Sequence, residues 1–240
     1  MSATTPRARA RARTMEDIVR IGRDHLAVHG AAALSLRAVA RDLGVVSSAV
    51  YRYVRSRDEL LTLLVIDGYT ELADAVDAAL APDSADSEAP ARRLRALGVA
   101  MRDWALAEPA RYGLLFGTPV PGYHAPAERT VAPGTRVIGA LLRILGNAYR
   151  AGLLGEPDPL PPVSPALAAD LARIGAEFDL ALPDWALVRG LSVWSGLIGA
   201  VSAEVFDMYG ADTFTDRAEV FDRQLDNLCA LAGLGDAPNG

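Results

Sequence analysis

The sequence predicts an all-α chain with a small basic N-terminal part and a larger acidic part behind it. Leucine and alanine dominate a chain of 240 residues that is 51% hydrophobic and only 6% aromatic, a composition typical of packed helices. No stretch shows the apolar and polar alternation of a strand. Residues 1–57 hold 11 arginines against 4 acidic residues, a net charge of +7, whereas residues 58–240 hold 13 against 26, a net charge of −13. This asymmetry indicates a polyanion-binding head on an acidic body.

The N-terminal residues divide into an arm and a first helix. Residues 1–13 (MSATTPRARARAR) have no apolar periodicity, so we expect a disordered arginine-rich arm, which either has no function or adds phosphate or minor-groove contacts. Over residues 15–29 the apolar side chains recur at helical spacing. Gly30 then ends the predicted helix.

Two short helices are expected next. Ser35 is the predicted N-cap of the first, which stops at Gly44, a residue suited to a tight turn. The second is predicted over residues 47–53. We expect it to begin at Ser47, with the apolar side chain of Val46 packed against the head.

Longer helices separated by polar and proline-rich loops fill the rest of the chain. Ser56 is expected to cap a helix over residues 57–80. Loops are expected at residues 81–90, 117–127 and 156–165. The other helices are predicted at residues 90–107, from Pro109 to Gly117, at 128–153 with an interruption at Pro133 and Gly134, and at 165–181, 184–209 and 216–232.

The two short helices around Gly44 form a helix-turn-helix pattern. In such a pattern the second helix lies in the major groove of DNA. Val50 and Val54, four residues apart, face inward. An open alternative makes Tyr51 a core aromatic between helices. The residues left to reach phosphates and base edges are Ser47, Ser48, Tyr51 and Tyr53.

Three parts of this region carry a family resemblance: Ile18 and Leu26 of the first helix, then LSLRAVARDLGV, then AVYRYVRSRDELL. Through them residues 14–64 resemble the DNA-binding domain of the TetR family of bacterial transcriptional regulators. We accordingly expect a DNA-binding domain over residues 14–60 and a regulatory domain over residues 61–240. By position, the DNA contacts that the resemblance implies fall on Ser35, Arg37, Ser47, Ser48, Ala49, Tyr51, Tyr53 and Arg57.

Two positions depart from this family pattern. Val46 stands where many members have a serine or another polar residue that caps the recognition helix. Either Ser47 takes over that role, or the cap is missing at a cost of about 1 kcal/mol. Val54 stands where many members have phenylalanine, and we expect the core to repack around the smaller side chain.

The acidic body carries a second resemblance. PARYGLLFGTPVPGYHAPA (residues 109–127) resembles the WHG type of C-terminal regulatory domain, and Trp194 and Gly199 match its motif. Ile198 stands where that group has histidine, so no role of the histidine is carried over. Few charges accompany the large aromatics on predicted inner faces, which suits an apolar or weakly polar organic ligand, unless the aromatics only fill the core. These candidate ligand-binding residues are Trp104, Tyr112, Phe116, Phe178 and Trp194.

The long helix over residues 184–209 is apolar on more than one face. The resemblance implies that the last two long helices pair with their copies in a second subunit, making a homodimer with a near-palindromic operator. The alternative is a central helix buried in a monomer. The candidate interface residues are Trp194, Gly196, Gly199, Ala203, Phe221, Leu225 and Leu228.

Other chemistries lack the residues that they need. His25 and His29 are four apart on the first helix, but no third ligand is evident, so we expect no metal. No catalytic constellation or phosphate loop is present, which predicts a protein that is not an enzyme and needs no cofactor. A single cysteine, Cys229, excludes a disulfide framework. With no apolar leader and no sufficiently long uncharged run, we expect a cytoplasmic protein without a membrane partner.

The sequence therefore predicts a homodimeric transcriptional repressor that a small-molecule effector releases from double-stranded DNA. The alternative is a ligand-binding or enzymatic helical bundle whose helix-turn-helix head no longer binds DNA.

Overall fold

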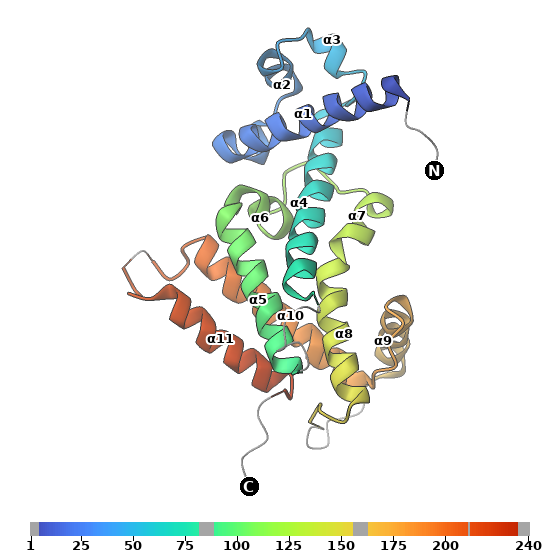
Figure 1. Cartoon of the computed structure of the whole chain (residues 1–240), viewed down its shortest axis with the longest axis vertical. Coiled ribbons are helices and arrows are strands. Elements are labelled where there is room, and N and C mark those ends of the chain that lie inside the picture. Colours follow the sequence, from blue (N-terminus) through green and yellow to red (C-terminus); the bar gives the residue numbers. More distant parts are fainter. Residues whose placement is uncertain (1–4, 82–88, 156–162, 211, 235–240) are drawn as a thin grey trace. The chain divides into compact units, whose positions relative to one another are not determined.

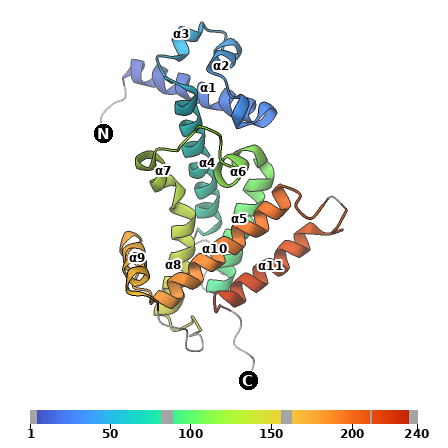
Figure 2. The same cartoon turned by 180° about the vertical axis from the view of Figure 1, so that it is seen from behind.

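The computed structural model describes residues 5–81, 89–155, 163–210 and 212–234, and every regular element in these ranges is helical (Figures 1 and 2). The predicted all-α class is confirmed. The chain forms two compact units: Met1–Glu71 with Glu108–Gly134, called the head unit below, and Leu72–Ala107 with Thr135–Gly240, called the body unit. The expected boundary at residue 60 therefore differs from the observed division. The difference arises because the fourth helix continues past residue 60 and a later segment packs with the head.

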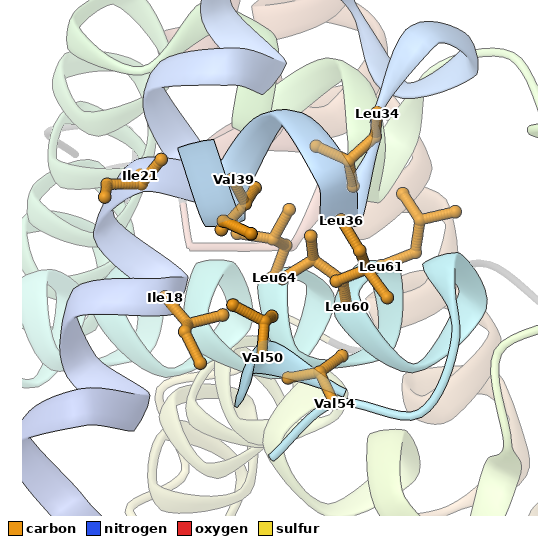
Figure 3. Packing of buried hydrophobic residues seen from close by; sticks show 11 residues of the cluster. Ile18, Ile21, Leu34, Leu36, Val39, Val50, Val54, Leu60, Leu61 and Leu64 are labelled. Carbon is orange, nitrogen blue, oxygen red and sulfur yellow. The ribbon is translucent and has the colours of Figure 1, made fainter. Parts of the chain in front are cut away.

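The head unit combines the helices of two separate segments, Met1–Glu71 and Glu108–Gly134. Its core joins the first four helices, and Figure 3 shows Ile18 and Ile21 meeting Val39 and Val50 there. Leu60, Leu61 and Leu64 complete the same cluster. The elements are α1 (Pro6–His29), the short 3-10 helix η1 (Ala31–Ala33), α2 (Leu36–Asp42), α3 (Ser47–Val50), the first part of α4 (Arg57–Ala79), α6 (Pro109–Phe116) and α7 (Ala127–Gly134).

The arm expected to be disordered is helical where the structure describes it. Helix α1 begins at Pro6, and the Thr5 hydroxyl accepts a hydrogen bond from the backbone N–H of Ala8 (3.3 Å). Proline suits the first helical position, and alanine and arginine are strong helix formers. Because a helix already formed over residues 15–29 is cheap to extend, these signals suffice without apolar periodicity. The prediction is wrong for residues 5–13, and residues 1–4 lie outside the described residues.

The start of α3 is only partly as expected. The helix begins at Ser47, as predicted, and ends at Val50 before a turn that extends to Tyr53. Val46 is its N-cap residue but is 72% exposed, and no side chain there caps the helix. The expectation that Val46 packs against the head is therefore wrong. Its carbonyl accepts the N–H of Ala49 (2.9 Å) while Val50 and Val54 fill the core.

The body unit is organised around α10 (Asp184–Val205). Among the described residues this is the helix long and apolar enough to cross a membrane, with a mean hydropathy of 1.4. We interpret it as a core helix, because α5, α8, α9 and α11 all pack against it. Those four helices span Pro90–Ala107, Arg136–Arg150, Pro165–Glu177 and Arg217–Leu231.

The C-terminal helices differ from the predicted ones in three places. The stretch expected at 128–153 forms two helices, α7 and α8, consistent with the predicted interruption at Pro133 and Gly134. Helix α9 ends at Glu177 and α10 at Val205, each four residues early. Asp179 and Asp207 follow these ends with φ of 54° and 51°, a left-handed conformation that stops a helix.

A cluster of charges links α1, α4 and α6 within the head unit. The Asp67 carboxylate on α4 accepts hydrogen bonds from Arg23 Nε on α1 (2.7 Å) and from the guanidinium of Arg111 on α6 (2.8 Å). Arg111 is only 2% exposed and also pairs with Glu71 (2.9 Å) and Glu108 (3.4 Å). Two arginines and three carboxylates on or next to α1, α4 and α6 therefore form one cluster.

Loss of the shared carboxylate should destabilise the protein more than loss of an exposed one. We expect Asp67→Asn to lower the free energy of unfolding by about 2 kcal/mol or more, because Arg111 keeps its charge with fewer partners. Asp74→Asn is the control: Asp74 is exposed, and Arg136 retains Asp77, so the loss should stay below about 0.5 kcal/mol. Urea denaturation measures both values, and equal effects would contradict the role of Asp67.

A second pair of variants tests the packing of the head. Val54 is fully buried and Val46 is 72% exposed, and neither lies inside a helix. Val54→Ala should lower the free energy of unfolding by about 2 kcal/mol through lost burial and a residual cavity. Val46→Ala should change it by less than about 0.5 kcal/mol. A large effect of Val46→Ala would show that its side chain is packed after all.

Candidate DNA-binding site

The turn between α2 and α3 depends on Gly44. Its φ is +69°, which residues with a side chain rarely adopt. The N–H of Gly44 donates to Arg41 O and that of Val45 donates to Ala40 O, both at 3.0 Å. These bonds close α2 and turn the chain into the segment before α3. Helices α2 and α3 then pack on α1 and α4 through the core of Figure 3, which leaves their other faces exposed.

All eight residues predicted to contact DNA remain at least partly accessible. Arg37, Ser48 and Tyr51 are exposed, the last by 43%. Tyr51 is therefore not the buried core aromatic of the alternative interpretation. The other five are half-buried: Ser35, Ser47, Ala49, Tyr53 and Arg57.

Four of these residues surround one recess. Ser35, Arg37, Tyr51 and Arg57 line it together with Leu34 and Leu36, and its volume is about 310 Å³. The Arg37 guanidinium and the hydroxyls of Ser35 and Tyr51 supply hydrogen-bond donors around this space, and Arg57 adds positive charge. Such a group of donors suits an anionic phosphate oxygen. The structure thus brings together residues from α2 and its N-cap, from the end of α3 and from the start of α4.

Arg57 has a local role that the sequence did not reveal. Its guanidinium donates to the carbonyls of Ala31 (2.9 Å) and Ala32 (3.3 Å), and it lies 3.7 Å from the carboxylate of Asp58. The side chain therefore ties the start of α4 to η1. Ser56 caps α4 as predicted, because its hydroxyl accepts the N–H of Glu59 (3.1 Å).

Ser35 occupies the predicted N-cap position of α2 without using its side chain there. Its backbone is extended, with φ of −138°, and its carbonyl accepts the N–H of Val39 (3.0 Å). Among the described residues, no backbone N–H at the helix N-terminus donates a hydrogen bond to the Ser35 hydroxyl. The predicted helix start is confirmed, whereas the capping hydrogen bond is not present.

His25 packs in the head as a hydrogen-bonded side chain. Its Nε2 lies 2.6 Å from a carboxylate oxygen of Asp42 at the end of α2, and its ring meets that of His29 edge-on at 5.8 Å. The hydrogen bond with His25, aided by Arg41, holds the pKa of Asp42 below its usual value. In the described ranges no group of three or more His, Cys, Asp or Glu residues could hold a metal ion.

The chain resembles known regulators over nearly its whole length. A family model described as bacterial regulatory proteins of the tetR family matches residues 18–64, and one described as the tetracyclin repressor-like C-terminal domain matches residues 94–228. The HTH-type transcriptional regulators Rv1816 of Mycobacterium tuberculosis and Mb1846 of Mycobacterium bovis are each 46% identical over 222 residues, which cover 92% of this chain and 93% of theirs. The chain belongs to the TetR family.

Solved structures agree with this assignment. The crystal structure of SCO4313 has a TM-score of 0.74 at 34% identity and covers 94% of this chain and 100% of its own. The TetR family transcriptional regulator PfmR from Thermus thermophilus, at 18% identity, shares the fold with a TM-score of 0.56 over 92% of this chain and 98% of its own. Residues 18–64 of the head unit, which hold α2, α3 and the start of α4, are therefore the helix-turn-helix part of a transcriptional regulator, whereas α6 and α7 lie within the C-terminal family match.

The candidate ligand-binding residues of this TetR-family chain fall in both units. In the head unit, Tyr112 is fully buried on α6, and its ring lies 5.1 Å from that of Phe116. Tyr69 meets Phe116 at 6.0 Å. The remaining three belong to the body unit, where Trp104 is buried and Phe178 and Trp194 are half-buried.

Several candidate dimer residues contact their own chain. Ala203, Phe221 and Leu225 are buried in the body unit. A Cβ at Gly196 would stand 2.6 Å from a methyl group of Leu228, so this glycine permits close packing of α10 on α11. Gly199 is different, because a Cβ there would meet nothing within 4 Å.

Sequence reasoning therefore did not separate the inner face of α10 from its outer one. The outer face includes Ser192, Ser195 and Gly199, which are exposed, and the half-buried Trp194. Spacing alone could have found this row, because residues 192, 195 and 199 recur at intervals of three and four. The buried candidates have structural contacts that account for them without a partner.

Proposed function

We propose that this chain is a homodimeric repressor that binds a near-palindromic operator and releases it when a small apolar or weakly polar molecule binds. The observation that carries the DNA-binding part is the recess of Ser35, Arg37, Tyr51 and Arg57 beside the exposed side of α3. Membership of the TetR family supports it, because repression, ligand binding and dimerisation are typical of that family. The same membership favours a cytoplasmic protein without enzymatic activity.

The head residues divide into two kinds of contact. Ser47, Ser48, Ala49 and Tyr51 are assigned to the major groove, where hydroxyls reach base edges and apolar groups reach thymine methyls. The other four residues are assigned to phosphates, which fix the position of the head on the duplex. These four are Ser35, Arg37, Tyr53 and Arg57.

Two groups of aromatic residues are the side chains proposed to bind the ligand. Tyr112 and Phe116 lie on α6, the helix that Arg111 ties to α4. In the body unit, Trp104, Phe178 and Trp194 are the proposed ligand-binding side chains, and the WHG-type assignment belongs to the same proposal. A ligand releases DNA only if it binds one arrangement of the heads better than the other.

DNA binding is tested with duplexes selected by the wild-type protein from a random pool. On the selected duplex, Arg37→Ala and Tyr51→Ala should each weaken binding about tenfold or more, because the first removes a hydrogen bond to a charged phosphate and the second a base contact, each worth about 1–3 kcal/mol. Arg223→Ala is the matched control, since Arg223 is exposed on α11. A gel-shift titration gives the affinities. If both head variants bound the duplex as tightly as the wild type, the assignment of Arg37 and Tyr51 as DNA contacts would be wrong.

The same experiment separates the alternative function. A helical bundle whose head has lost DNA binding would select no duplex and would not be retained on mixed-sequence DNA at low salt. A functional head should be retained, and retention should fall steeply as salt rises.

Dimerisation is tested by a charge on the outer face of α10. Gly199→Glu should yield monomers, because a dimer of the proposed kind would bury the new carboxylate at its interface. Ala176→Glu on the exposed face of α9 is the control and should leave the dimer intact. Sizing chromatography with light scattering measures the mass. A dimeric Gly199→Glu variant would refute this interface.

A further inference from the structure

The first two turns of α1 concentrate positive charge on a described helix. Arg7, Arg9, Arg11 and Arg13 are all exposed, and no acidic residue lies between Pro6 and Arg13. Within the part of the chain that the structure describes, none of the four forms an ion pair. Cations at a helix N-terminus are unfavourable because the helix dipole is positive there. No ion pair within the described residues offsets this unfavourable interaction with the helix dipole. Locally unfavourable features that persist without compensation are typical of functional positions.

The four arginines form two rows on opposite sides of the helix. At 3.6 residues per turn, Arg7 and Arg11 share one side, and Arg9 and Arg13 lie roughly 200° away. The row of Arg7 and Arg11 continues the side of α1 whose later residues are buried, beginning with Ile18. It therefore faces the same way as the side of α1 that packs on the head core.

A contact with Tyr53 fixes the position of the first row. The guanidinium carbon of Arg11 lies over the Tyr53 ring, 5.1 Å from its centroid, a distance at which a cation is attracted to an aromatic face. Tyr53 ends the turn that follows α3, and Figures 1 and 2 both show the N-terminal half of α1 alongside α3. The row of Arg7 and Arg11 thus extends the positive surface of the recognition segment.

We propose that Arg7 and Arg11 bind backbone phosphates of the duplex beside the stretch that α3 occupies, whereas Arg9 and Arg13 do not. The proposal rests on the proposed function, since it assumes that the head binds DNA. The partner is duplex DNA because the row is purely cationic and lies on the same head as the recess of Arg37 and Arg57. An arginine held over an aromatic ring can keep its N–H groups for a phosphate.

Two double variants with the same change of charge test this placement. In Arg7→Ala/Arg11→Ala and Arg9→Ala/Arg13→Ala, alanine preserves the helix because it is the strongest helix former. Affinity for the selected duplex and for a scrambled one is measured between about 50 and 200 mM salt. For a dimer, the first variant should make the slope of log K against log salt shallower by about four, since each lost phosphate contact contributes about 0.9. The second variant should leave the slope close to that of the wild type.

A footprint gives a second measurement. In hydroxyl-radical cleavage of the selected duplex, the wild type should protect the backbone beside the stretch that α3 contacts. The variant Arg7→Ala/Arg11→Ala should lose this flanking protection and keep the protection at the α3 contacts. Equal slopes and footprints for the two variants would overturn the proposal, and so would a wild-type slope in the first variant. If the wild type selects no duplex and binds neither probe, the proposed function fails as well. If Arg37→Ala weakens binding but both arginine rows behave alike, only the present inference fails.

Discussion

The head unit depends on one carboxylate, Asp67, at which arginines from two other helices converge. Arg111 is almost fully buried, and a guanidinium removed from water is tolerated only if carboxylates match its charge. Asp67 and Glu71 on α4 supply that match. Arg23 reaches the same Asp67 from α1, and this hydrogen bond raises the pKa of Arg23 above its usual value. Helices α4 and α6 therefore cannot separate without taking from the buried Arg111 two of the carboxylates that match its charge, and α1 joins the same cluster through Arg23.

This constraint bears on how a ligand could act on DNA binding. Helix α6 carries Tyr112 and Phe116 next to Arg111, and α1 carries the core face on which α2 and α3 rest. A ligand that displaced α6 would shift the partners of Asp67 and thereby bias the position of α1. The mechanism requires two arrangements of the cluster with different ligand affinity. The ion pairs of Asp67, rather than an apolar contact, would then couple ligand binding at α6 to DNA binding by α2 and α3.

The sequence predicted the features that local chemistry decides. Gly44 and Ser56 marked the turn and the cap, and both perform these roles. What the sequence left open depends on partners far along the chain. Arg23 and Asp67 are 44 residues apart, and no periodicity reveals such a pairing. Gly196 shows the same limit, because a small residue on an apolar helix fits a close approach of α11 as well as that of a second subunit.

The helical start of α1 bears on DNA binding by a chain whose net charge is −6. Salt screens charges beyond about 10 Å at ordinary ionic strength, so a phosphate responds to the charges near it rather than to the net charge. A disordered arm would have to lose conformational entropy when its arginines bound DNA. In a helix that entropy is already lost on folding, and Arg11 is further restrained over Tyr53. Preorganisation of this kind lets a few arginines contribute more to affinity than their number suggests.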